Sequence, residues 1–477
     1  MRASASLRRA LVLLGATVFL ASCFVSQPRT GWNVNSRLGL VFAVVDEGRL
    51  NIDSYHDQPP TETYDKAFFE GHHYSDKIIG QSLIAVPVYA VIRGVSNLFD
   101  VEPDFQLTQY LLTRVTVSIP AALAAVLMAL LFVRLGARPR RAILTTSGVF
   151  FGSMLFGFST VFIPYLPGVA SCLGALLVLR GPPLTSRRAA LFGGLSGLAL
   201  LFDLTFNITV AVLGVLFLVE LRKLPRERWL RVAGAACGAA AVPLTIFLAY
   251  SVYIFGSPTI PYSYLKVEYF REGMSQGVMG VTAPKLHAVW FLTVHAFRGI
   301  LFWSPWLLAA IVCCVRTLRR RDDPLRLVAI ASLVTLLAYL LFNAGYYQWW
   351  AGSTMGPRLM IPMFAIVPLG LAVACRPDAP RWLWRSLMGT LAVSVALSLP
   401  ISMVDPQTGG GNSEEVLINA RVGTRLVVPQ LNVLSDFYGL RWADLKQPVG
   451  IPVTLSLLLC LLVVVGGTTW AFRTADA

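Results

Sequence analysis

Acidic side chains suited to proton transfer follow an apolar segment near the start of the chain. Asp46 and Glu47 come directly after that segment, and the residues beyond them include further acids and histidines. A carboxylate beside a membrane surface can take a proton from an acceptor hydroxyl as a general base. A single acid in such a loop is more simply explained as a solvated residue, so the grouping is the signal. We predict Asp46 and Glu47 as catalytic residues.

A third acidic candidate lies within an apolar stretch. Asp203 stands between Leu200-Leu201-Phe202 and Leu204-Thr205-Phe206. An ionisable group in an apolar stretch is costly to bury, which makes it a functional candidate by default. A turn residue at a helix end is the alternative interpretation.

Three cations occur among aromatic residues. Lys77 follows Asp76, Arg298 precedes Gly299 and Ile300, and Arg358 closes the segment that begins at Tyr346. A lipid phosphate at the membrane surface needs such cations, and a guanidinium can bind it in bidentate fashion. We predict that all three bind a donor phosphate.

The same segments supply candidate contacts to a sugar or an acceptor. Aromatic faces can stack on sugar rings, and the glycines from Gly352 to Gly356 let backbone approach a ligand closely. An ordinary aromatic belt at the membrane interface explains the Trp/Tyr run equally well. The candidates are His73, Tyr74, Asp76, Tyr347, Trp349 and Trp350.

Evidence for a metal or a cofactor is weak. His56, His72 and His73 lie near acids and could ligate a divalent ion, but their spacing is not diagnostic. We therefore assign no metal site and leave a divalent metal as an option. The seven cysteines, Cys23 among them, lie in or beside apolar segments without a CxxC, so we expect neither a disulfide nor a zinc–cysteine site. Walker, Rossmann and GxSxG motifs are lacking in the sequence.

Composition indicates the elements that must position these residues. Hydrophobic residues make up 56% of the chain, charged residues only 14%, and the mean hydropathy is +0.65. Apolar stretches close to the ~20 residues needed to cross a bilayer recur along the chain. We predict an all-α, polytopic membrane protein of about twelve transmembrane helices, forming one domain over residues 1–477. The helices are expected near 9–27, 108–134, 142–158, 161–179, 189–204, 206–221, 230–254, 288–315, 326–345, 358–375, 383–402 and 450–472.

The net charge of +15 serves as an orientation signal, because most of the excess lies in short loops. With the N-terminus inside, alternate loops rich in Arg and Lys all fall on the cytoplasmic side. The outer loops are then 28–107, 255–287, 346–357 and 403–449, which carry nearly all the candidate residues. We expect a bacterial inner membrane protein whose site faces the periplasm or cell exterior, with membrane lipids and no nucleic acid as partners.

Two parts of the first outer loop look like helices that lie on the membrane. Residues 33–45 have their apolar side chains on one helical face, and the apolar stretch 78–99 is interrupted by Pro87, Arg93 and Asn97. At the N-terminus, Leu20-Ala21-Ser22-Cys23 resembles a lipobox. The alternative, which we prefer, is a first membrane helix that needs no lipid anchor.

These motifs resemble those of bacterial members of the GT-C glycosyltransferase superfamily, near the protein O-mannosyltransferase and lipid A aminoarabinose transferase group. The resemblance covers most of the chain and rests on Asn33–Asp57, His73–Lys77, Phe297–Pro305 and Trp349–Arg358. It implies transfer of a sugar from a polyprenyl-phosphate donor to a glycan, lipid or protein acceptor outside the membrane. It also implies roles for individual residues: a base at Asp46, phosphate-side groups at Asp76, Lys77, Arg298 and Arg358, and an acid at Asp203.

The chain departs from the family pattern at two places. Relatives often have Pro-Pro or Pro-Gly after the Asp-Lys pair, where this chain has Ile78-Ile79-Gly80. Many carry a polar or acidic residue between the third and fourth helices, where this chain reads Phe162-Ile163-Pro164-Tyr165.

We therefore predict a glycosyltransferase that works by a single displacement with an Asp base. A transporter or flippase for a lipid-linked or polar substrate is the alternative, and a non-catalytic membrane scaffold is a third option. Transporters often show internal repeats and charged residues at mid-membrane. Here no repeat is found and the polar groups gather in the outer loops.

Overall fold

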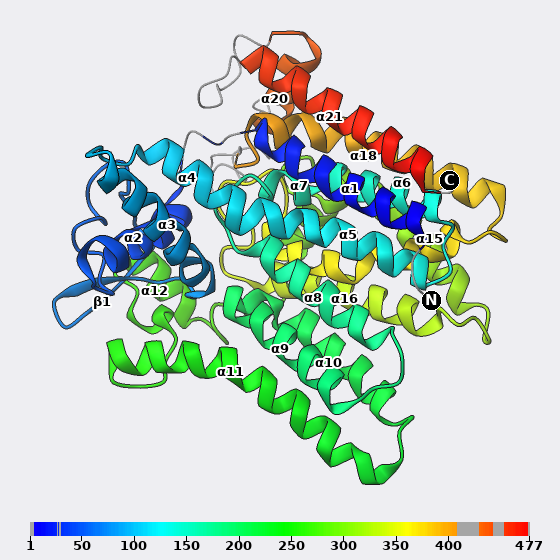
Figure 1. Cartoon of the computed structure of the whole chain (residues 1–477), viewed down its shortest axis with the longest axis horizontal. Coiled ribbons are helices and arrows are strands. Elements are labelled where there is room, and N and C mark those ends of the chain that lie inside the picture. The colour runs from blue at the N-terminus through cyan, green and yellow to red at the C-terminus, as the bar shows by residue number, and fades with distance from the viewer. Residues whose placement is uncertain (1–3, 26, 28–29, 408–428, 442–452, 476–477) are drawn as a thin grey trace. The chain divides into compact units, whose positions relative to one another are not determined.

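The computed structural model describes residues 4–25, 27, 30–407, 429–441 and 453–475. The chain is a multi-pass membrane protein that is 71% helical with almost no sheet (Figure 1). It forms two compact units: the first comprises Met1–Ser26, Ala125–Ser159 and Val281–Ala477, and the second comprises Gln27–Ala124 and Thr160–Gly280. The prediction of one domain stays a prediction.

In the described part of the chain, seven helices are long and apolar enough to cross a membrane, or eight if a bent pair counts as one span. The bent pair is Arg358–Ala365 with Val367–Cys375, and two shorter apolar helices are Tyr165–Leu179 and Trp306–Leu318. The predicted count of about twelve spans therefore stays a prediction. The seven are Ala5–Cys23, Phe105–Arg134, Leu204–Leu221, Arg226–Phe255, Arg326–Gly345, Arg381–Val404 and Val453–Thr474.

The first unit packs its helices around apolar side chains. Near the N-terminal helix, the Ser22 and Ser159 hydroxyls lie 2.9 Å apart. Its elements are α1 (Ala5–Cys23), α6 (Pro139–Phe151), α7 (Met154–Phe158), α13 (Leu286–Thr293), α14 (Ile300–Trp303), α15 (Trp306–Leu318), α16 (Arg326–Gly345), the 3-10 helices η6 (Arg358–Ala365) and η7 (Val367–Leu371), α17 (Ala372–Cys375), α18 (Arg381–Val404), α20 (Pro429–Tyr438) and α21 (Val453–Thr474).

The second unit contains the first long loop and the helices that follow it. Its elements are α2 (Trp32–Phe42), the π-helix η1 (Ala43–Glu47), β1 (Lys66–Phe69), β2 (His72–Ser75), α3 (Gly80–Leu98), α4 (Phe105–Thr113), the π-helix η2 (Arg114–Ser118), α8 (Tyr165–Leu179), α9 (Ser186–Phe202), η3 (Leu204–Phe206), α10 (Asn207–Leu221), η4 (Arg226–Arg228), α11 (Trp229–Phe255), η5 (Pro261–Tyr264) and α12 (Glu268–Ser275). Helix α5 (Ile119–Arg134) continues α4 and η2 into the first unit.

Apolar side chains from the loop and the helices share one core in the second unit. Leu40 of α2, Ile52, Ile79 and Leu201 of α9 are buried together with Ile78 and Phe247. Gly80, the first residue of α3, approaches the end of α9 so closely that an added Cβ would lie 2.3 Å from the Leu201 carbonyl oxygen. This core fixes the loop against the end of α9, which is where the candidate site forms.

The two helices expected on the membrane surface are present as α2 with η1 and as α3. Within the described chain, α3 is not among the helices that could span a membrane. The hairpin β1–β2 and helix α12 were not predicted from the sequence. Three predicted helices are interrupted: 142–158 forms α6 and α7, 288–315 forms α13, α14 and α15, and 358–375 begins as two 3-10 helices that contain Pro362 and Pro368. Most of the predicted outer loop 403–449 lies outside the described residues.

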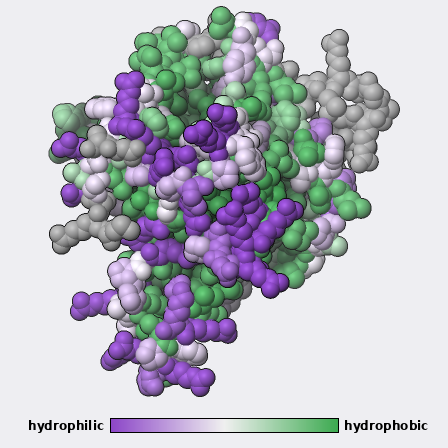
Figure 2. Space-filling view, turned by 90° about the vertical axis from the view of Figure 1, so that its right-hand side faces the viewer, coloured by the Kyte–Doolittle hydropathy of each residue, from purple (hydrophilic) through white to green (hydrophobic). Residues whose placement is uncertain are grey.

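Three loops of the first unit that are rich in arginine, around residues 138, 323 and 376, lie side by side. Their expected placement on one side of the membrane requires this. Arg138 donates its backbone N–H to the Cys375 carbonyl at 3.0 Å, and the Arg141 guanidinium donates to the Arg376 carbonyl at 2.7 Å. Arg376 pairs in turn with Asp323 at 3.2 Å. Figure 2 shows hydrophilic side chains gathered on the face that lies toward the marked N-terminus in Figure 1.

Candidate functional site

Helix α2 carries an arginine on its buried side. The Arg37 side chain is 2% exposed, and its Nη1 donates to the Asn33 carbonyl at 2.9 Å and also to the Asn33 side-chain oxygen. Ser82 of α3 donates its hydroxyl to the Arg37 carbonyl at 3.0 Å. A buried guanidinium is costly unless acceptors surround it, so the neighbours of Arg37 are informative.

The hairpin brings two aspartates together at its open end. Lys66 of β1 pairs with Ser75 of β2, so Asp65 before β1 lies beside Asp76 after β2. The Lys77 Nζ bridges the two carboxylates, 2.8 Å from Asp65 Oδ2 and 3.0 Å from Asp76 Oδ2. A register shift of the hairpin would separate these three charges.

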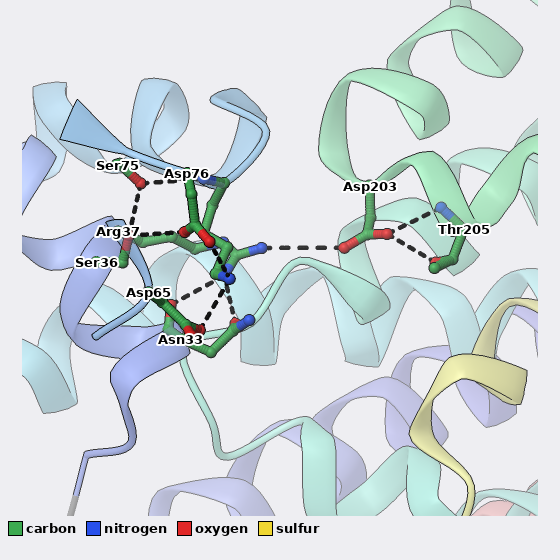
Figure 3. Close-up of polar contacts among 9 residues, drawn as sticks. Asn33, Ser36, Arg37, Asp65, Ser75, Asp76, Asp203 and Thr205 are labelled. Carbon is green, nitrogen blue, oxygen red and sulfur yellow. Dashed lines mark hydrogen bonds and ion pairs between the residues drawn. The ribbon is translucent and has the colours of Figure 1, made fainter. Parts of the chain in front are cut away.

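Two serines tie this end of the hairpin to α2 (Figure 3). The hydroxyls of Ser36 and Ser75 lie 2.9 Å apart, and Ser36 donates to Asp76 Oδ1 at 3.3 Å. Ser75 also accepts the Lys77 backbone N–H at 3.3 Å. Asp76 is thereby held between the helix and the lysine.

Asp203 reaches the same place from α9. That helix ends at Phe202, and the extended backbone of Asp203 lets its Oδ1 accept from the Thr205 N–H at 2.9 Å and the Thr205 hydroxyl at 2.8 Å. Its Oδ2 lies 3.9 Å from Arg37 Nη2 (Figure 3). Arg37, Asp65, Asp76, Lys77 and Asp203 together form what we call the buried charge cluster.

Three carboxylates face two cations in this cluster, and burial shifts the pKa of one of the carboxylates, Asp76. Burial raises the pKa of Asp76 to about 6, against the opposing effect of Lys77. For Lys77, burial disfavours the charge, but Asp65 and Asp76 outweigh it and raise the pKa of the ammonium. Burial, with the charges of Asp203 and Asp76, also raises the pKa of nearby Tyr262.

The cluster has an accessible side and a covered side. The side chains of Asp203, Asp65 and Lys77 are 16%, 14% and 10% exposed, whereas those of Asp76 and Arg37 are 4% and 2% exposed. A ligand would therefore meet the lysine and two carboxylates first, with Arg37 behind them.

Asp46 lies elsewhere on the same helical segment, in η1. Tyr89 donates its hydroxyl to Asp46 Oδ2 at 2.9 Å, Tyr55 does so at 3.4 Å, and Arg93 Nε lies 3.3 Å from Oδ1. At ~1.5 Å per residue, Asp46 is roughly 13 Å along the axis from Arg37. Asp46 is thus not a member of the cluster, and Glu47 beside it is exposed.

His73 and Tyr74 stand on β2. His73 accompanies His72 and His56 around Asp53, where its Nδ1 lies 3.2 Å from Asp53 Oδ1. The Tyr74 ring packs edge-on against Phe255 at 5.8 Å, within a small apolar group on the other side of the hairpin.

Arg298, in the first unit, is fully buried and directs its guanidinium at backbone. It donates to the carbonyls of Trp350 at 2.9 Å, Thr354 at 2.7 Å and Gly352 at 2.6 Å, and also to that of Phe297 at 3.0 Å. Four of the five guanidinium N–H groups are therefore engaged, three of them with the loop that precedes Arg358.

The aromatic candidates lie in this same loop. Trp349 and Trp350 are buried in an apolar core with Phe291, and the Trp349 and Phe291 rings stack at 5.4 Å. Tyr347 is half-buried, as is Arg358. Gly352 (φ +72°) passes so close to Arg358 that an added Cβ would lie 3.5 Å from Arg358 Nη2. Arg298 therefore fixes the backbone beside Arg358.

Comparison with solved structures identifies the fold. The chain is similar to the crystal structure of ArnT from Cupriavidus metallidurans bound to undecaprenyl phosphate, with 13% identity, a TM-score of 0.50, and coverage of 98% of this chain and 77% of that one. Similarity to the apo structure is equivalent, with 12% identity, a TM-score of 0.50, and coverage of 98% and 76%. The chain has a GT-C-like glycosyltransferase fold. No protein-family model and no curated protein matches the sequence.

Within the GT-C-like fold, sequence reasoning found three members of the buried charge cluster, namely Asp76, Lys77 and Asp203, and missed Arg37 and Asp65. One signal was available: Arg37 stands among the apolar side chains of a short amphipathic segment, where an ionisable residue needs an explanation. Asp65 carries no such signal, because only the hairpin register places it beside Asp76.

Proposed function

We propose that this chain transfers a sugar from a polyprenyl-phosphate donor to an acceptor hydroxyl on the outer face of the membrane. The observation that supports the proposal best is the buried charge cluster, in which Lys77 and Arg37 stand among three carboxylates. Such a group offers cations for a phosphate and a base for a hydroxyl within one site.

The outer face is the side we propose for the site. Helix α9 begins beside Arg187 and Arg188 and ends at Phe202, so Asp203 lies at the end opposite those basic residues. Positive residues are retained in the cytoplasm, which would put Asp203 and the cluster outside.

Lys77 is the primary ligand we propose for the donor phosphate. Its side chain is 10% exposed against 2% for Arg37, so it is the more exposed of the two cations of the cluster, and Arg37 would add charge from behind. A phosphate at Lys77 would compete with Asp65 and Asp76 for the ammonium. Because the pKa of Asp76 is raised to about 6, protonation of this carboxylate would relieve the competition.

The reaction we propose is a single displacement. The acceptor oxygen bonds to the anomeric carbon, its proton passes to a carboxylate, and the bond from that carbon to the phosphate oxygen breaks. The electron pair leaves with the polyprenyl phosphate, whose charge Lys77 stabilises. A phosphate leaving group needs no general acid.

Asp203 is the base we favour, and Asp46 is the alternative. The Asp203 Oδ1 is fixed by Thr205, whereas among the described residues Oδ2 has the 3.9 Å ion pair with Arg37, a separation longer than a hydrogen bond, so Oδ2 could accept from an acceptor hydroxyl. Asp46 accepts from two tyrosines and pairs with an arginine, so a hydroxyl would have to displace one of these groups.

Arg298 and Arg358 have different parts in the proposal. The backbone carbonyls around Arg298 suit a positioning residue that fixes the loop from Trp350 to Thr354. Half-buried Arg358 remains a candidate phosphate ligand, and Tyr347 a candidate sugar contact. Trp349 and Trp350 are buried in the apolar core of the first unit beside that loop.

The test is transfer by the purified protein in lipid nanodiscs, using a panel of synthetic polyprenyl-phosphate sugars and measuring release of polyprenyl phosphate. We expect the wild type to release polyprenyl phosphate, and so should the control Arg49→Ala, which changes an exposed residue. Lys77→Gln should lose this release. Movement of an intact donor between leaflets of liposomes, without release of polyprenyl phosphate, would favour a flippase instead.

A further inference from the structure

A second group of polar side chains lies in the first long loop, beside the hairpin β1–β2. It takes no part in the proposed transfer. Three of the five histidines of the chain gather around Asp53. His72 Nδ1 lies 2.6 Å from Asp53 Oδ2, His73 Nδ1 lies 3.2 Å from Oδ1, and the rings of His56 and His73 are 3.9 Å apart. Imidazole nitrogens and carboxylate oxygens are the atoms with which proteins bind zinc and similar metal ions.

We propose that Asp53, His56 and His73 bind a zinc-class divalent ion. One ligand atom from each lies within 4.8 Å of the others. Zinc with ligand bonds of ~2.0–2.1 Å in a tetrahedron needs ligand atoms roughly 3.3 Å apart. The pair Asp53 Oδ1 and His73 Nδ1, at 3.2 Å, already has this separation.

The donor set selects the ion. Two imidazoles and one carboxylate suit zinc and its transition-metal neighbours, whereas magnesium and calcium prefer oxygen ligands. Three protein ligands leave a fourth position for water.

His72 would orient the carboxylate that binds the ion, as hydrogen-bond partners of metal ligands commonly do. Its Nδ1 bonds the second oxygen of Asp53, which would orient the first oxygen toward the ion. The His73 backbone N–H donates to Asp53 Oδ1 at 2.7 Å, so the carboxylate is held from two sides.

The backbone holds both ligand-bearing segments in register. The Ile52 N–H donates to the His73 carbonyl at 2.7 Å, and the Thr63 N–H donates to the His56 carbonyl at 2.9 Å. The ion would therefore bridge the segment 52–56 to β2, the strand that leads directly to Asp76 and Lys77.

Lys66 would compete with the ion for His56. Its Nζ lies 2.9 Å from His56 Nδ1, so the ammonium occupies a nitrogen that a metal could use. Lys266 is also near, while Asp57 and Glu62 oppose the two lysines, so with Asp53 the acids outnumber the cations. Removing Lys66 should therefore strengthen metal binding, whereas it would weaken an anion site.

The test is metal binding by the full-length, tag-free protein in nanodiscs, measured by cobalt(II) titration with visible absorption and displacement by zinc. We expect one equivalent of tetrahedral cobalt and tighter binding in Lys66→Met. Asp53→Asn, His56→Gln and His73→Gln should each weaken binding by about tenfold or more, and His72→Gln should weaken it less. The control His295→Gln should bind as the wild type does.

A thermal melt of each variant without metal identifies variants that fail to fold. Three results would overturn the proposal. The wild type binds no cobalt, the double variant His56→Gln/His73→Gln binds cobalt as tightly as the wild type, or Lys66→Met binds cobalt more weakly than the wild type. Since the readout is binding rather than transfer, its outcome does not depend on the proposed glycosyltransferase activity.

Discussion

Arg37 of α2 and Asp203 at the end of α9 face each other, with Nη2 and Oδ2 3.9 Å apart, although they are far apart in the sequence. The pair joins the first long loop to the membrane helices of the second unit. It also ties the cations of the buried charge cluster to the carboxylate that we propose as base.

Replacing Lys77 with Ala should reduce both stability and transfer. The substitution leaves Asp65 and Asp76 without the ammonium that bridges them, and removal of one partner of a buried ion pair costs about 3–5 kcal/mol. Loss of a charge-stabilising group should lower turnover by about 10²–10³-fold. Thermal unfolding and transfer rates check both effects, and Lys77→Arg should recover stability more than activity. Wild-type turnover in a folded Lys77→Ala protein would exclude the lysine from catalysis.

The two candidate bases can be separated by matched amide variants. We expect Asp203→Asn to lower turnover by about 10²–10⁴-fold, since it removes the proton acceptor. Asp46→Asn should change turnover by about tenfold or less, because it leaves the cluster intact. Single-turnover rates with saturating donor separate chemistry from binding. A larger loss in Asp46→Asn than in Asp203→Asn would reverse the assignment.

Binding of a lipid phosphate should strengthen in the wild type, relative to Asp76→Asn, as the pH falls through about 6; the comparison cancels the titration of the phosphate itself. The pKa of Asp76 is raised to about 6, so its carboxylate is charged above that pH and competes for Lys77, and is neutral below it. Asp65, Asp203, Arg37 and Tyr262 surround the same group. The dissociation constant of undecaprenyl phosphate measured from pH 8 to pH 5 checks this trend. Asp76→Asn should flatten it, and an equally steep trend in that variant would assign the titration to another group.

Gly80→Ala should disturb the site from a distance. A Cβ there would lie 2.3 Å from the Leu201 carbonyl oxygen, so the start of α3 and the end of α9 must separate. Such overpacking costs about 1–3 kcal/mol, and here it would shift Asp203 relative to Lys77. Gly94→Ala in the same helix is the control, because nothing lies within 4 Å of its added Cβ. Equal melting temperatures and rates for the two variants would refute the close approach.

Arg298→Gln should loosen the loop from Trp350 to Thr354. The lost hydrogen bonds to backbone carbonyls should make that loop more sensitive to proteolysis. Arg298→Lys should restore only part of the effect, since an ammonium cannot reproduce the fork of the guanidinium. Exposed Arg319→Gln is the control. A changed affinity for lipid phosphate with unchanged proteolysis would indicate a direct phosphate ligand instead.

The fold was largely predictable because apolar runs and basic loops report membrane helices directly. The ranges 326–345, 383–402 and 230–254 lie within a few residues of α16, α18 and α11. Breaks inside predicted spans were harder to foresee. Pro362 and Pro368 lie in 3-10 helices, and the segment 294–299 interrupts an otherwise apolar stretch.

The site was less predictable because its members meet through tertiary contacts. Asp203 and Lys77 stood out as charges beside apolar or aromatic residues, whereas Asp65 gains its place only from the hairpin register. Asp46 attracted attention by its neighbours in sequence, yet its carboxylate is engaged by Tyr89 and Arg93. Sequence proximity to other acids did not indicate which acid would join the cluster.

The central claim is that the buried charge cluster binds the lipid phosphate through Lys77. The most direct measurement is the dissociation constant of undecaprenyl phosphate for the nanodisc-embedded wild type, Lys77→Gln and the control Arg49→Ala. We expect Lys77→Gln to weaken binding by about tenfold or more and Arg49→Ala to bind as the wild type does. Unchanged affinity in a folded Lys77→Gln protein would contradict it.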